Sequence, residues 1–200
     1  MNRQQRWSVT WPTPRGVLRA YEPSAAELTA RAPILAAFYN ETYNRAMMDN
    51  SQTMSAAEVV EHFTLLRRAG GKPFLLERNG DLVGDADLRH IGRETAEFAI
   101  LVGCRLEQGK GLGTLFGILL HAFAFARLEL ERMFVTIIPA NIPSQRLFAK
   151  LGYQPDDSPA ARAFADLETD LTFSLARTAF LSAHAAIMPE ITWAFRPSGA

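Results

Sequence analysis

The sequence predicts an α+β domain built on a mixed, mostly antiparallel sheet. Two observations predict it. Asn79-Gly80 separates two runs with strand character, and this dipeptide between such runs is the strongest short signal for an antiparallel hairpin. Further along, the strand-like run at 96–102 is followed by a long apolar helix and then by another strand-like run at 133–138, which indicates a strand–helix–strand crossover.

The N-terminal part predicts strand character followed by helix. Residues 1–15 are expected to form an arm or an early strand, and the alternation in 17–21 predicts a short strand. Ser24 and Glu27 have the spacing of a capping box, so a helix is expected to begin there. Pro33 is expected either to kink this helix or to open a second one that reaches about Met47.

A second helix is predicted after residue 55. Ser55 and Glu58 form another capping-box pattern. Val59, Phe63 and Leu66 follow the i, i+4, i+7 spacing of one buried helical face. The helix is expected to end near Gly70-Gly71, since glycine commonly terminates helices.

The middle of the chain predicts a three-stranded meander. Its strands are expected at 73–77, 82–88 and 96–102, with the Asn79-Gly80 turn between the first two. A glycine-rich loop follows, and then a helix that reaches about Leu128. This helix is apolar nearly all round, which predicts burial.

The last part of the chain predicts a buried strand, a helix and a final strand. The strand at 133–138 precedes a helix that begins at Asn141, with Pro143 in its first turn. The segment 154–163 is expected to be a loop, and 170–175 a strand. Beyond it, 179–188 predicts a C-terminal helix and 192–195 a short extra strand.

Length and composition predict one domain over 1–200, with an N-terminal arm at 1–15 and a C-terminal extension at 176–200. The chain has 200 residues, 48% of them hydrophobic, and a formal net charge of zero, which does not favour a nucleic-acid partner. No apolar run approaches the about 18 residues of a membrane span. The single Cys104 excludes an intrachain disulfide and indicates the cytoplasm. The extension suggests a homodimer contact or a cover over the site.

The loop Gln108-Gly109-Lys110-Gly111-Leu112-Gly113 lies between a strand and a helix. Bare backbone N–H groups at a helix N-terminus bind phosphate. Dinucleotide-binding loops need a different glycine spacing, and Walker A loops need Ser or Thr after the Gly-Lys pair, where this chain has Gly111. A turn without a ligand and a nucleotide-binding protein of another fold remain as alternatives.

A second motif narrows the choice. The pattern Gln108-x-x-Gly111-x-Gly113 is followed about thirty residues later by Asn141-Ile142-Pro143-Ser144-Gln145-Arg146-Leu147-Phe148-Ala149-Lys150-Leu151-Gly152-Tyr153. The two motifs, in this order and at this separation, resemble the GNAT N-acetyltransferases, in the branch of RimJ/RimL-like and spermidine acetyltransferases. The resemblance implies a sheet with a central splay, helices on both faces, and acetyl-CoA as co-substrate.

The resemblance also implies which residues hold coenzyme A. Backbone N–H groups of the glycine loop would bind the pyrophosphate, and the pantetheine arm would pair with the strand end near 100–103. A solvated loop lysine is an equal alternative for Lys110. The expected coenzyme A contacts are Leu101, Val102, Gly103, Gln108, Gly109, Lys110, Gly111, Leu112, Gly113, Asn141, Ser144, Phe148 and Lys150.

Acetyl transfer to an amine needs a neutral amine, and a carboxylate can take the proton. Glu97 is the expected base or substrate contact, with an exposed strand glutamate as the alternative. Ser144 is expected to protonate the leaving thiolate or to cap its own helix. Many family members carry tyrosine as general acid where this chain has Phe148, which keeps open a second function: a coenzyme A-binding sensor without catalysis. Tyr153 is expected to pack.

The remaining polar residues carry weaker predictions. Asp85, Asp87 and His90 suggest a metal site, but alternation sets His90 on the opposite face, so a solvated strand edge is expected and no metal. Tyr39 is expected to belong to the core. The acceptor is expected to be a small molecule or a protein N-terminus, and its identity is not encoded in any motif of the sequence.

Overall fold

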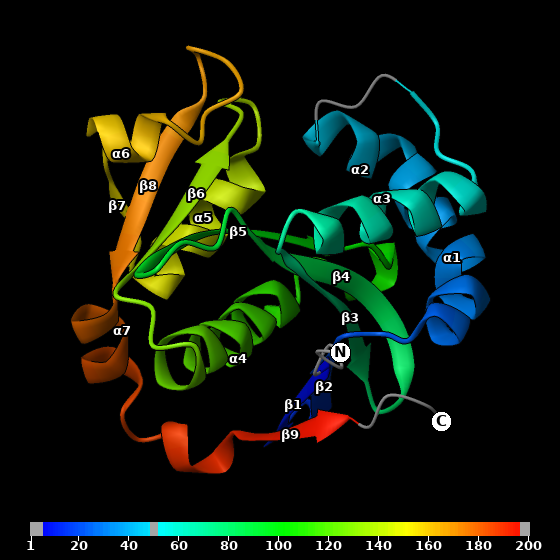
Figure 1. Cartoon of the computed structure of the whole chain (residues 1–200), viewed down its shortest axis with the longest axis horizontal. Helices are drawn as coiled ribbons and strands as arrows, with labels where there is room; N and C mark the ends of the chain where they lie inside the picture. The colour runs from blue at the N-terminus through cyan, green and yellow to red at the C-terminus, as the bar shows by residue number, and fades with distance from the viewer. Residues whose placement is uncertain (1–5, 49–51, 197–200) are drawn as a thin grey trace.

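The computed structural model describes residues 6–48 and 52–196 (Figure 1). The strands of this part of the chain form one mixed sheet in the order β7-β8-β6-β5-β4-β3-β2-β1-β9, antiparallel throughout except for β5 and β6. The strands are β1 (Arg6–Thr13), β2 (Gly16–Tyr21), β3 (Lys72–Arg78), β4 (Asp81–Arg89), β5 (Thr95–Val102), β6 (Arg132–Ile137), β7 (Gln154–Pro155), β8 (Leu171–Ala176) and β9 (Thr192–Arg196).

Helices cover both faces of the sheet, and each face has its own hydrophobic cluster. α1 and α3 pack on one face, while α4 packs on the other against α5 and α7. The helices are α1 (Ala25–Asn40), α2 (Thr42–Met47), α3 (Ala56–Arg68), α4 (Leu112–Arg127), α5 (Ile142–Leu151), α6 (Pro159–Arg162) and α7 (Arg177–His184), with the short 3-10 turns η1 (Arg105–Glu107) and η2 (Met188–Glu190). None of the helices in the described ranges is long and apolar enough to cross a membrane.

The sheet splays between its two parallel strands. Thr95 to Glu97 of β5 pair with Arg132 to Phe134 of β6, and no pairing continues beyond them among the described residues. On its other side β5 stays paired with β4 as far as Val102. The C-terminal half of β5 therefore presents one open edge to the interior, and this confirms the expected splay.

The expectation that Pro33 starts a new helix is wrong, and a kink at this residue stays a prediction. α1 runs continuously through Pro33 and ends at Asn40. The break comes at Glu41, whose backbone is extended at ψ 131° and whose carboxylate accepts the Asn44 N–H at 2.9 Å. This side chain caps α2, so the capping residue rather than the proline divides the two helices.

The first and the last described segments both join the sheet. Of the two expectations for residues 1–15, the early strand is confirmed: the segment contains β1, which pairs with β2 on one side and with β9 on the other. The extension is not a site cover in its described part, because β9 extends the sheet edge and α7 packs on α4. A dimer contact stays a prediction. The expected loop at 154–163 contains β7 and α6, since the Ser158 hydroxyl caps α6 by accepting the Ala161 N–H at 3.3 Å.

Candidate active site

The glycine loop exposes backbone N–H donors at the start of α4. Gly111 is its N-cap at φ 81° and offers no side chain, and Gly109 has φ 71°. In the described part of the chain, no group accepts a hydrogen bond from the N–H groups of Leu112, Gly113 or Thr114. A Cβ added at Gly109 or Gly111 would meet no atom within 4 Å, so the loop beside these two glycines is open. The geometry fits an anion.

Gln108 fixes this loop from inside the protein. Its Nε2 donates to Asn44 Oδ1 and to the Val102 carbonyl, both at 2.7 Å. One side chain therefore ties the loop to α2 and to the end of β5. The motif glutamine therefore sets the position of the loop, and its contact with coenzyme A stays a prediction.

We call the hollow between the glycine loop and the opened edge of β5 the splay cavity, with a volume of about 560 Å³. Its lining includes three cations, Arg105, Arg146 and Lys150, while Glu107 is paired with Arg78 at 2.7 Å. The expected coenzyme A contacts that line it are Leu101, Val102, Gln108, Gly109, Gly111, Leu112, Gly113, Asn141, Ser144 and Lys150.

Three expected contacts do not line the splay cavity: Gly103, Lys110 and Phe148, the last of which lines the adjoining cavity described below. Gly103 donates its N–H to Val83 at 2.9 Å, accepts from Asn44 at 3.0 Å, and has the Phe38 ring 2.4 Å from where a Cβ would be. Its backbone is thus engaged by the protein. The Lys110 carbonyl accepts from Arg15, and its side chain is exposed and does not line the cavity.

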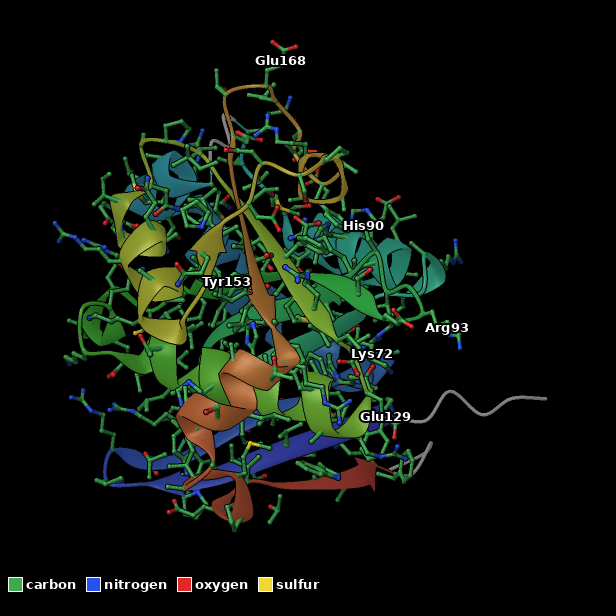
Figure 2. The ribbon with its side chains drawn as sticks, turned by 90° about the vertical axis from the view of Figure 1, so that its left-hand side faces the viewer. Lys72, His90, Arg93, Glu129, Tyr153 and Glu168 are labelled. Atoms are coloured by element: carbon green, nitrogen blue, oxygen red, sulfur yellow. The ribbon has the colours of Figure 1, made fainter. Side chains whose placement is uncertain are left out.

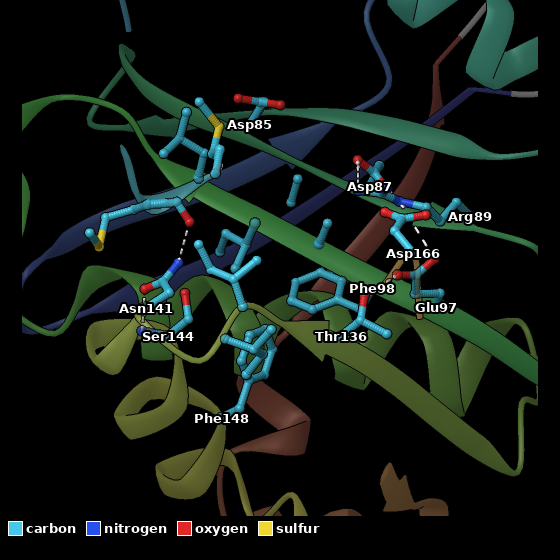
Figure 3. Close-up of a pocket in the computed structure, with 18 of the residues that line it drawn as sticks. Asp85, Asp87, Arg89, Glu97, Phe98, Thr136, Asn141, Ser144, Phe148 and Asp166 are labelled. Atoms are coloured by element: carbon cyan, nitrogen blue, oxygen red, sulfur yellow. Dashed lines mark hydrogen bonds and ion pairs between the residues drawn. The ribbon is translucent and has the colours of Figure 1, made fainter. Parts of the chain in front are cut away.

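A second hollow of about 510 Å³, which we call the acidic cavity, adjoins the first (Figure 3). Asp85 and Asp87 line it and are buried, so the expectation of a solvated strand edge is wrong. They were misjudged because β4 is a central strand, between β3 and β5 and under α1. The charged residues of its lining are Asp85, Asp87, Glu97, Asp166, Asp170 and a single arginine, Arg89.

Glu97 is buried at one end of the acidic cavity, where both carboxylate oxygens have partners. Oε1 accepts from Thr136 Oγ1 at 3.1 Å, and Oε2 lies 3.0 Å from His90 Nδ1 and 3.9 Å from Arg89 Nε. His90 reaches Glu97, contrary to expectation, because its φ of 50° ends the alternation of β4. Within the described residues no group of acidic, histidine or cysteine side chains could hold a metal.

Asp85 is less completely partnered. Its Oδ2 accepts from the Tyr39 hydroxyl at 2.7 Å, whereas Oδ1 is buried without a partner among the described residues. Burial, together with the nearby Asp87, raises the pKa of Asp85 to about 7, although the Tyr39 hydrogen bond and Arg89 oppose this shift. Burial and Asp85 in turn raise the pKa of Tyr39 well above its ordinary value.

The two cavities meet at residues that line both. Asn141 cannot offer its whole side chain to a ligand, because Oδ1 accepts the Ser144 N–H at 3.0 Å and Nδ2 donates to Met47 at 2.7 Å. Asn141 is therefore the cap of α5, and the Ser144 hydroxyl is left without a hydrogen bond in the described structure. The shared residues are Met47, Met48, Ile100, Leu101, Asn141 and Ser144.

The aromatic residues of the second motif point into the protein. Phe148 lines the acidic cavity and packs edge-on against Phe98 and Tyr153, at 6.2 and 5.2 Å between ring centroids. The Tyr153 hydroxyl lies 2.6 Å from His121 Nε2 in the core. Tyr153 therefore does not reach the meeting point of the cavities, and Ser144 carries the hydroxyl group there.

Sequence reasoning missed most of the acidic cavity. Charged residues on alternate positions of a central strand were an available signal for Asp85 and Asp87, since such a strand has no solvated edge. Asp166 and Asp170 come from a segment without motif or periodicity, and no local pattern marks them. Arg146 lies on the predicted helix of the second motif, where an exposed arginine is unremarkable.

Comparison with known proteins gives one family and many similar folds. The family model of the acetyltransferase (GNAT) domain matches residues 15–154. RimJ of Mycobacterium smegmatis, solved with CoA-disulfide, is 16% identical at a TM-score of 0.64, covering 94% of this chain and 97% of its own. Spermidine N-acetyltransferase of Vibrio cholerae, solved with CoA and spermine, is 18% identical at a TM-score of 0.63, covering 82% of this chain and 98% of its own. The aminoglycoside acetyltransferase AAC(6')-Ib, solved with coenzyme A, is 17% identical at a TM-score of 0.65, covering 78% of this chain and 95% of its own. No curated protein sequence matches.

Proposed function

We propose that this chain, which belongs to the GNAT acetyltransferase family, transfers an acetyl group from acetyl-CoA directly to a primary amine. The acceptor would be a protein N-terminus, a polyamine or another small amine. The observation that carries the proposal is the meeting of two cavities at Leu101 and Ser144, one ending on free backbone donors and the other lined with carboxylates. The cytoplasm stays the expected compartment, because one cysteine cannot form an intrachain disulfide.

The splay cavity suits coenzyme A along its whole length. The N–H groups at the start of α4 would receive the pyrophosphate, with the positive end of the helix dipole behind them. Arg146 and Lys150 are exposed cations on the neighbouring α5 and would attract the remaining phosphate. The open edge of β5 next to Leu101 and Val102 would pair with the amide groups of the pantetheine arm.

The acidic cavity suits a cationic acceptor. Five carboxylates face one guanidinium there, which favours a protonated amine although the whole chain has no net charge. Glu97 would contact a positive group of the acceptor at the far end. Ser144 would donate its hydroxyl proton to the departing sulfur, whose thiol has a pKa of about 8.5 and which therefore leaves readily.

Acetyl-CoA is expected to raise the melting temperature, because a ligand that binds the native state stabilises it. The double variant Arg146→Glu, Lys150→Glu should lose most of this shift, since the introduced charges repel phosphate. Arg93→Glu is the matched control, as Arg93 is an exposed arginine at the surface (Figure 2) that lines neither cavity. Differential scanning fluorimetry measures the melting temperatures of wild type and of both variants. If millimolar acetyl-CoA does not shift the melting temperature of the wild-type protein, the proposal is contradicted.

A panel of amines then separates an enzyme from a coenzyme A sensor. Release of free thiol from acetyl-CoA should occur with at least one class of amine among N-terminal peptides, polyamines and aminoglycosides. Mass spectrometry should find one acetyl group on the acceptor nitrogen. A melting shift with acetyl-CoA but no thiol release across the panel would favour the sensor instead.

Glu97→Gln is expected to raise the KM for the acceptor about tenfold, the equivalent of roughly 1.4 kcal/mol, with a smaller change in kcat. The substitution keeps the shape of the side chain and removes the charge that would attract the acceptor. Glu94→Gln serves as control, because Glu94 is exposed in the preceding turn. A hundredfold fall in kcat at constant KM would instead identify Glu97 as the base.

A further inference from the structure

Glu97 lies too far along β5 from the place of reaction to take a proton directly from the attacking nitrogen. Leu101 lines both cavities, so the acetyl group must come close to it when donor and acceptor occupy their cavities. Glu97 lies four residues earlier on the same strand, which corresponds to about 13 Å. A carboxylate that takes a proton directly from the attacking nitrogen has to be nearer to Leu101 than this.

Asp85 fulfils this condition. It lies directly opposite Leu101 in the antiparallel ladder of β4 and β5, a pairing that brings Cα atoms to within about 5.5 Å. Asp87 is one pair further on, opposite Ala99, and its carboxylate is held by Arg89 at 2.8 Å. Of the carboxylates that line the acidic cavity on these two strands, Asp85 is thus the one nearest to Leu101 in the ladder.

The hydrogen bonding of Asp85 leaves one oxygen for a substrate. Tyr39 fixes Oδ2 from α1, while Oδ1 has no partner in the described structure although the side chain is only 9% exposed. An unpartnered buried carboxylate oxygen costs folding free energy. A hydrophobic residue would pack at this site without that cost, so the retained carboxylate indicates a role in binding or chemistry.

We propose that Asp85 takes the proton from the acceptor ammonium and that Tyr39 is its positioning residue. The inference rests on the acetyltransferase function proposed above. One N–H bond breaks and its proton moves to Oδ1, which leaves a neutral amine with a free electron pair. The nitrogen then bonds to the acetyl carbonyl carbon while the carbon–sulfur bond breaks. Its second proton passes through the Ser144 hydroxyl to the sulfur, and Asp85 returns the first to solvent.

The surroundings of Asp85 set a suitable proton affinity. The titratable and charged groups that line the cavity with it are Tyr39 of α1, His62 of α3, Asp87 and Arg89 of β4, Glu97 of β5, and Asp166 and Asp170 of the segment before β8. Burial is the largest influence and raises the pKa of Asp85 to about 7. A base works best when its pKa lies near the working pH, and this one is ionised in about half of the molecules at neutrality.

The test is Asp85→Asn, which keeps the size of the side chain. We expect kcat to fall at least a hundredfold, while the melting shift with acetyl-CoA stays within 1 or 2 °C of wild type. With an acceptor amine of pKa above 9, the wild-type rate should rise through a limb near pH 7, and the variant should lack this limb. Without any ligand, the variant should melt at a higher temperature than wild type at pH 8, because an ionised buried carboxylate has been removed.

Two further variants make the result specific. Tyr39→Phe removes the hydrogen bond that favours ionised Asp85, so the limb should move to higher pH rather than disappear. Asp81→Asn, an exposed aspartate on the same strand, should leave rate and pH profile unchanged. Turnover by Asp85→Asn within fivefold of wild type overturns the assignment and leaves the acetyltransferase proposal intact. Absence of turnover by wild type with every amine overturns both.

Discussion

Gly84→Ala is expected to lower the free energy of unfolding by about 4 kcal/mol, at the upper end of what one substitution does. A Cβ at this position of β4 would lie 1.9 Å from the Leu101 carbonyl oxygen and 3.1 Å from the Gly103 nitrogen. These are backbone atoms of the neighbouring chain segment, so no side-chain rotation relieves the clash. The two strands would have to separate where Val102 pairs with Gly84.

Urea unfolding followed by circular dichroism measures this loss. Gly92→Ala is the matched control, because its nearest contact would be Thr95 Oγ1 at 3.4 Å, an ordinary distance, and its stability should change by about 0.5 kcal/mol or less. Because Gly84 precedes Asp85 and faces the end of β5, any folded fraction of the variant should also bind acetyl-CoA weakly. An alanine variant as stable as wild type would contradict the close strand contact.

The second large effect concerns His121 and pH. Burial lowers the pKa of His121 to about 4, so the native protein keeps this imidazole neutral while the unfolded chain takes up a proton near pH 6.5. Nδ1 donates to the Gly117 carbonyl at 2.7 Å and Nε2 accepts from the Tyr153 hydroxyl. The stability contributed by His121 is therefore present above pH 6.5 and is lost toward pH 4. Between pH 7 and pH 4.5 the loss should be about 2.5 kcal/mol.

Asp85 works in the opposite direction over the same range. Its folded pKa is raised, so its contribution is most favourable at low pH and is lost as pH rises through about 7. The wild-type protein should therefore show a weak pH dependence between 4.5 and 7, in which the two effects oppose each other. Asp85→Asn removes one of them, and its free energy of unfolding should rise more steeply with pH than that of wild type.

Urea denaturation at pH 4.5 and 7 measures these slopes. In the Asp85→Asn background, a second change of His121→Gln should flatten the dependence again, because glutamine does not titrate. His184→Gln is the comparison: burial also lowers the pKa of this partly buried histidine at the end of α7, so its removal should flatten the dependence less than His121→Gln does. If His121→Gln leaves the slope of the Asp85→Asn protein unchanged, His121 is not the group that takes up the proton.

Local chemistry made much of the fold predictable. The Ser24 and Ser55 capping boxes, the Asn79-Gly80 turn and the glycine loop each act within a few residues, and all four lie where the sequence predicts them. Pro33 was misjudged for a related reason. A proline biases the chain, but the cap at Glu41 decided where the helix ends.

The donor side and the acceptor side of the site differ in how they are encoded. The chain by itself determined the glycine loop and the helix of the second motif, because turn glycines, caps and helix starts are properties of neighbouring residues. Only the tertiary structure decided that Asp85 is buried, that it stands beside Leu101, and that Asp166 and Asp170 join it. The order of the strands in the sheet decides which residues are buried and where α1, β4, β5 and a distant loop meet. It therefore brings together residues that no short sequence pattern connects.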